Sequence, residues 1–154
     1  MEKNTLEIPE KCEVRGSGLK GALVDSMPFF IRLTGAMVKS GSSLPGGDGL
    51  LRAFGKMNAA TITGIGLFGV KKTHGPRRVA EEWLKMIVGI DARFEIGKVS
   101  DDEVEINLLE CPLGLTPEDG RHRCITAMAT DSETVRSLGG RLVIGETIAT
   151  GADR

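Results

Sequence analysis

Apolar residues recur at helical spacing through the first ninety residues of the chain. Residues 27–40 carry Phe29, Leu33 and Met37 at intervals of four, which predicts an amphipathic helix with Pro28 in its first turn. The stretch GSSLPGGDG then has the composition of a loop. A second apolar stripe begins at Leu50 and reaches Ile65, where closely spaced glycines make the pattern ambiguous. Two glycine-rich helices are therefore expected.

A third helix is more sharply bounded, and a change of period follows it. THGPRRVAEEWLKMIVGI has Pro76 at its start, Val79 and Trp83 on one face, and Gly89 as a candidate C-cap. ARFEIGKV and EVEINLLE then alternate apolar and polar residues around SDD. This alternation predicts a β-hairpin with an irregularity at Gly97.

The remainder predicts a helix over 124–138, broken near residues 130–131, and a last strand over 141–150. Helices followed by an antiparallel hairpin indicate an α+β fold. We expect one domain, 1–154, in which glycine-rich N-terminal helices pack on a small antiparallel sheet. Its mainly helical part is 1–90, and 91–154 hold the hairpin, a helix between the hairpin and the last strand, and that strand.

Composition narrows the class of partners. The formal net charge is -1, and aromatic residues make up 4% of the chain with no tyrosine, so a basic face or a base-stacking platform for nucleic acid is not expected. We find no run of eighteen apolar residues and no apolar leader, which predicts no membrane span and a cytoplasmic location. An odd number of cysteines, three, excludes a fully paired disulfide set within one chain.

The loop ECPLGLTPEDGRHRC concentrates the candidate chemistry. Cys111 and Cys124 are either small buried residues that flank a loop or reactive thiols, with His122 as an acid–base partner or a solvated residue. A tetrahedral zinc site from Cys111, Cys124, His122 and Glu146 is conceivable, although a C-x12-C pair is unlike the usual short zinc spacings. The two thiols are expected to lie close together.

Two further sets of residues suggest a ligand. Arg77 and Arg78 lie in a basic run at a predicted helix start, where they could hold an anion or form a solvated connector. Aromatic and large apolar side chains of the helical half could wall an apolar pocket, although ordinary core is the alternative for most of them. The candidate walls are Phe29, Phe30, Phe54, Phe68, Trp83 and Met86.

The pattern of strand, CP, loop, Cys, helix and GGRLVIGETIATGAD over residues 92–154 resembles two related families. One is the 4-vinyl reductase domain, a small-molecule-binding module. There the resemblance implies zinc ligands at Cys124 and Glu146, but the third ligand position is Ala149 and the fourth would lie beyond Arg154. The other is the L-2-amino-thiazoline-4-carboxylate hydrolase-like family, which Cys111-Pro112 and Thr147-Ile148-Ala149 match.

From these observations we expect the chain to be a small-molecule-binding module of the 4-vinyl reductase type, with an apolar pocket. Phe54, Trp83, Arg77 and Arg78 are its candidate ligand contacts. One alternative is a hydrolase of a thiazoline or similar cyclic amidine carboxylate, with Cys111, Cys124 and His122 as catalytic residues. Another is an interaction domain that forms a homodimer through its glycine-rich helices. We further expect Glu146 to face the interior, paired or metal-bound, because it shares strand parity with apolar neighbours.

Overall fold

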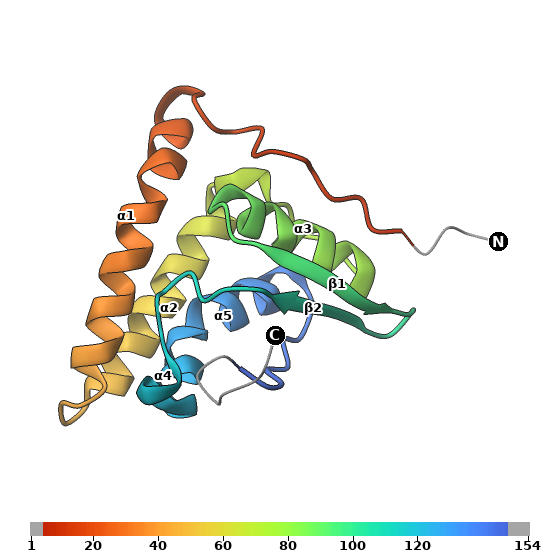
Figure 1. Ribbon diagram of the computed structural model, residues 1–154. Helices are drawn as coiled ribbons and strands as arrows, with labels where there is room; N and C mark the ends of the chain where they lie inside the picture. The colour runs from red at the N-terminus through yellow and green to blue at the C-terminus, as the bar shows by residue number, and fades with distance from the viewer. Residues whose placement is uncertain (1–4, 148–154) are drawn as a thin grey trace.

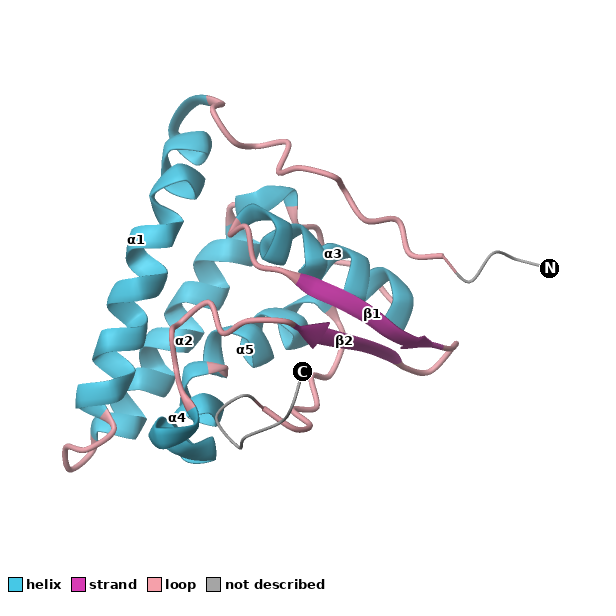
Figure 2. Ribbon diagram, in the orientation of Figure 1, coloured by secondary structure: helices cyan, strands magenta, loops and turns pink. Residues whose placement is uncertain are grey.

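The computed structural model describes residues 5–147 and shows an α+β fold, as predicted (Figure 1). Five α-helices and one antiparallel hairpin make up the described chain, joined by irregular segments (Figure 2). The helices are α1 (Gly18–Gly41), α2 (Gly47–Gly64), α3 (Pro76–Gly89), α4 (Gly120–Ala127) and α5 (Ala129–Leu138). The strands are β1 (Phe94–Val99) and β2 (Val104–Leu108), and short 3-10 turns cover Leu67–Gly69 and Pro117–Asp119.

The hairpin and α3 confirm the two clearest patterns in the sequence. Pro76 opens α3 and Gly89 is its last residue. Strands β1 and β2 pair with Ile96 opposite Ile106, and the register shifts between Ile96 and Val99, around the predicted irregularity at Gly97. The inward side chains of the hairpin pack against a core built mainly on α3, in which Leu84 is fully buried.

Helix α1 begins nine residues before the predicted start, so Pro28 lies inside the helix instead of in its first turn. The apolar stripe continues upstream of Pro28 through Val24, which is fully buried in the main core, and this burial favours the extra turns. The predicted helix over 124–138 is two helices, which begin at Gly120 and break at Met128.

The predicted last strand does not form over residues 141–147, which are irregular; residues 148–150 lie outside the described part of the chain. The short described segment instead follows α5, and Arg121 of α4 holds it by donating to the carbonyls of Ile144 and Gly145, at 3.1 and 2.6 Å. These contacts use side-chain donors, whereas a strand would need a neighbouring strand backbone.

A second, smaller core positions the candidate site. It joins α1, α2, the loop after β2 and α4, and its buried members are Val38, Leu51, Leu115 and Ala127. Helix α2 also crosses α5 closely, since a Cβ on Gly55 would come within 2.9 Å of the Ala129 Cβ. Through Leu115, which is buried in this smaller core, the loop that carries Cys111 packs against α1 and α2.

Candidate functional site

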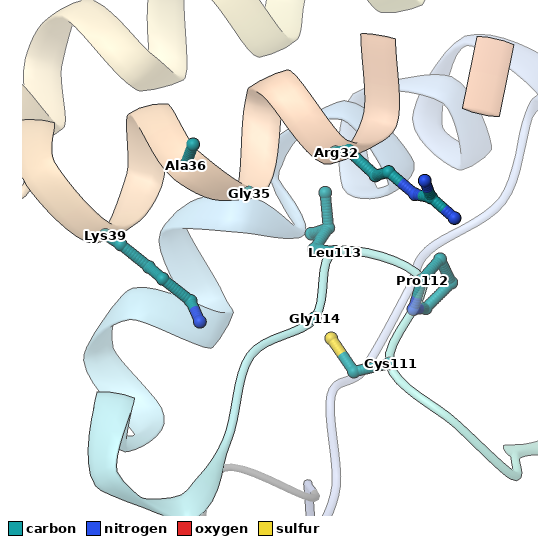
Figure 3. A pocket seen from close by; sticks show the side chains of 8 residues that line it. All are labelled: Arg32, Gly35, Ala36, Lys39, Cys111, Pro112, Leu113 and Gly114. Carbon is teal, nitrogen blue, oxygen red and sulfur yellow. The ribbon is translucent and has the colours of Figure 1, made fainter. Parts of the chain in front are cut away.

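An open cleft of about 320 Å³ lies between α1 and the loop that follows β2 (Figure 3). One wall comes from α1 and the other from the CPLG segment of the loop. Its lining residues are Arg32, Gly35, Ala36, Lys39, Cys111, Pro112, Leu113 and Gly114. A smaller hollow of about 140 Å³ shares Arg32 and Pro112 with it, so Arg32 stands between the two spaces.

Gly35 allows the loop to approach α1 this closely. It is buried, and a Cβ placed on it would overlap the carbonyl oxygen of Leu113. The absence of a side chain at this helical position therefore sets the distance between the two walls of the cleft.

Arg32 and Lys39 give the cleft its positive charge. They lie seven residues apart on α1, so both fall on the same side of the helix. The Lys39 Nζ lies 3.4 Å from Asp119 Oδ2, whereas Arg32 has no hydrogen bond or ion pair with the residues the structure describes. Arg32 is exposed at the mouth of the cleft, and its guanidinium is available to a ligand.

Asp119 is the carboxylate that pairs with Lys39. The Thr116 backbone N–H donates to Asp119 Oδ2 at 2.8 Å, and this hydrogen bond is the largest cause that lowers the pKa of the Asp119 carboxyl. Lys39 lowers the pKa further, and Arg123 lies 3.5 Å from Asp119 Oδ1. The carboxylate thus stays charged and shared between two cations, leaving Lys39 only partly neutralised.

The two loop cysteines both lie beside the smaller core. Cys111 and Cys124 both pack against the smaller core, whereas Cys12 packs against the main one. Burial raises the pKa of the Cys124 thiol, a hydrogen bond with Thr147 opposes this, and the nearby Cys111 adds to the increase. The Cys111 side chain, in contrast, lines the cleft (Figure 3).

The metal and nucleophile predictions rest on Cys111, Cys124, His122 and Glu146. Over residues 5–147, no three His, Cys, Asp or Glu side chains gather as metal ligands would. Glu146 is exposed, which contradicts its predicted interior position; without a strand at 141–147, no alternation turns its carboxylate inward. Zinc binding and catalysis by the cysteines remain predictions.

Arg121, His122 and Arg123 of α4 each contact another segment of the chain. His122 Nε2 lies 2.5 Å from Asp48 Oδ2 at the start of α2, and Arg123 donates to the hydroxyls of Ser42 and Ser43. Two positions apart on a helix, His122 and Cys124 point about 160° away from each other around the helix axis. His122 of α4 therefore pairs with Asp48 of α2 and links these two helices. The sequence did not predict this contact.

The aromatic pocket predicted from the sequence is not assembled. Phe29 and Phe30 stack edge to face, with centroids 5.7 Å apart, on the exposed side of α1, where they are 67% and 45% exposed. Met86 and Phe68 are core residues, and the Phe68 ring covers the backbone of Gly89. Phe54 is half-buried.

Trp83 is also part of the core. It is 5% exposed, and its Nε1 donates to Asp131 Oδ1 at 3.1 Å. At the start of α3, Arg77 is half-buried and Arg78 is exposed. Neither arginine lines the cleft, so anion binding there remains a separate prediction.

Sequence reasoning missed Arg32, Gly35 and Lys39. A seven-residue spacing of two cations on one predicted helix was available as a signal, but their pairing with the CPLG loop depends on a contact across almost eighty residues. Comparisons with protein-family models, with curated proteins and with solved structures found no match.

One helix of the described chain, α1, is long and apolar enough to cross a bilayer by length and composition. Core helices of soluble proteins and signal sequences share these properties, so they assign no membrane by themselves. The predicted cytoplasmic location stays a prediction.

Proposed function

We propose that this protein is a small-molecule-binding module that holds a small carboxylate in the cleft between α1 and the CPLG loop. The observation that carries the proposal is the Arg32 guanidinium, which stands unpaired among the described residues at a cleft that Lys39 also lines. A guanidinium can bind a carboxylate through two parallel hydrogen bonds. The class of function agrees with the resemblance to the 4-vinyl reductase domain, while the location differs from the aromatic pocket expected there.

The apolar residues that line the cleft indicate which chemical group is attached to the carboxylate of the ligand. Ala36, Pro112 and Leu113 offer apolar surface beside the two cations. Ligand pockets usually measure about 300–1,000 Å³, so a space of about 320 Å³ suits a small molecule. A carboxylate attached to a short apolar or aromatic group matches this combination of charge and surface.

Binding is tested by calorimetry with carboxylates of increasing apolar size, such as acetate, isovalerate and benzoate. Arg32→Ala is expected to weaken the best ligand about 10- to 100-fold, since a hydrogen bond to a charged group contributes roughly 1.5–3 kcal/mol. Arg52→Ala is the matched control, because Arg52 is an exposed arginine on α2 outside the cleft. Equal affinities of the two variants would contradict the proposal.

An independent readout comes from the thiols. A ligand in the cleft should slow alkylation of Cys111, which lines it, and leave alkylation of Cys12 unchanged, because Cys12 packs against the other core. Protection of both cysteines, or of neither, would place the ligand elsewhere.

A further inference from the structure

Helix α2 is apolar on both of its faces. Its inner face, with Leu51, Gly55 and Ile62, packs within the chain, and α5 covers Gly55. Its opposite face is an outer stripe at intervals of three and four residues, and every member of it is exposed: Leu50, Ala53, Met57, Ala60 and Gly64. Within the described chain, Leu50 is 72% exposed and Met57 59%.

This pattern matches that of a helix covered on two sides. Arg52 and Lys56 separate the two apolar faces on one flank of α2, and spacings of three and four residues are typical of helices that pair along a seam. Among the residues that the structure describes, neighbours cover only the inner side of α2. We infer that the outer stripe of α2 is the contact surface for a second copy of this chain, in an antiparallel pair of α2 helices centred on Met57.

The order of large and small residues favours a second copy over other partners. In an antiparallel pair with a two-fold axis at Met57, Leu50 lies opposite Gly64 of the partner subunit, and Ala53 lies near Ala60 of the partner subunit. No atom of residues 5–147 lies within 4 Å of a Cβ built on Gly64, so these residues leave free the space that a large side chain would need there. The stripe is thus complementary to itself, as a two-fold contact requires.

Helix α1 offers further exposed apolar surface next to α2. It lies beside α2, to which it is joined by a short connection, and Val38 of α1 and Leu51 of α2 share the smaller core (Figure 1). Its outward side chains are also apolar, with Leu19 79% and Leu33 45% exposed. Helices of 24 and 18 residues are about 36 and 27 Å long, and at a width of about 10 Å they offer roughly 600 Å². This value is an upper limit, because it counts both helices over their full lengths, and it falls at the lower end of the roughly 600–1,000 Å² per partner that standard interfaces bury.

The contact is separate from the ligand cleft, and its basis differs from the glycine-based pairing expected from sequence. Gly35 and Gly55 are occupied by neighbours from the same chain, Leu113 and Ala129. The surface available to a partner is instead made by Leu50, Met57 and the small residues between and after them. Self-association therefore does not depend on the proposed carboxylate binding.

Light scattering after size exclusion tests the pair with the full chain at about 10–100 µM. Wild type is expected at twice the chain mass of 16.4 kDa. Met57→Glu should weaken the dimer at least tenfold, and Val143→Glu should not, because Val143 is 73% exposed but lies outside α1 and α2. Gly64→Leu should also dissociate the dimer, and Leu50→Ala combined with Gly64→Leu should restore it, since the large and small positions are exchanged. Circular dichroism checks that each variant is folded.

The axis is tested separately with a single cysteine at position 57. In a chain whose three natural cysteines are serine, Met57→Cys should form a disulfide-linked dimer with oxidised glutathione, which takes up the two electrons and is reduced to two thiols. Val143→Cys should not. A wild-type monomer throughout this concentration range overturns the inference, and flotation of that monomer with phosphatidylcholine–phosphatidylglycerol vesicles would assign the stripe to lipid. A dimer that Met57→Glu and Gly64→Leu leave intact overturns it equally.

Discussion

Asp131 couples the stability of the fold to pH. Burial raises the pKa of its carboxyl from the ordinary 3.8 to about 6, and the hydrogen bond from Trp83 Nε1 opposes part of that increase. Asp131 as a whole residue is only half-buried, but its carboxyl group is desolvated. The pKa depends on the surroundings of the carboxyl group, so the burial of that group decides it. The folded state therefore holds a proton that the unfolded chain releases near pH 4.

The sign of the effect follows from proton binding. Between about pH 4 and pH 6 the folded state binds more protons than the unfolded state, so the free energy of unfolding falls as pH rises. A pKa difference of about 2 corresponds to roughly 3 kcal/mol at 1.36 kcal/mol per pH unit. This stability is fully present below pH 4 and is lost as pH rises through about 6.

Asp131→Asn removes the titration and keeps an oxygen that can accept from Trp83. We expect the free energy of unfolding of the variant, relative to wild type, to increase by roughly 3 kcal/mol between pH 4 and pH 7. Trp83 is the only tryptophan, so its fluorescence reports urea unfolding at each pH, at constant protein concentration. Asp102→Asn is the control, because Asp102 is exposed in the hairpin turn.

A constant difference in the free energy of unfolding between Asp131→Asn and wild type would refute this reasoning. If the difference in free energy between Asp131→Asn and wild type is the same at every pH from 4 to 7, the carboxylate does not titrate as its burial requires. A change of equal size in Asp102→Asn would mean that the pH dependence belongs to the surface.

Two further predictions concern the cleft and its thiols. Gly35→Ala should destabilise the protein by about 1–3 kcal/mol in urea unfolding, because its Cβ would overlap the Leu113 carbonyl. Gly49→Ala, in open space on α2, should be neutral or stabilising by up to about 1 kcal/mol, and equal effects would refute the close approach. Because burial raises the pKa of Cys124, the midpoint of its alkylation rate against pH should lie above that of an ordinary thiol; a midpoint at or below that value contradicts its desolvation.

Local chemistry made part of the fold predictable. Pro76 and Gly89 bound α3, and alternation around SDD produces β1 and β2, because proline, glycine and a two-residue period act over a few positions of the chain. Where a neighbour decided the outcome, the sequence pattern was insufficient. Residues 141–147 alternate as a strand would, yet they are irregular and are held by Arg121.

The candidate site depends on tertiary structure even more. The sequence singled out Cys111 and Cys124, since thiols beside a loop are conspicuous in any context. Arg32 acquires meaning only because Gly35 lets the Leu113 backbone approach α1, which forms the cleft that Arg32 and Cys111 share. Periodicity shows which residues share a face of a helix, but whether that face meets the protein interior, a loop or water depends on contacts between residues far apart in the chain.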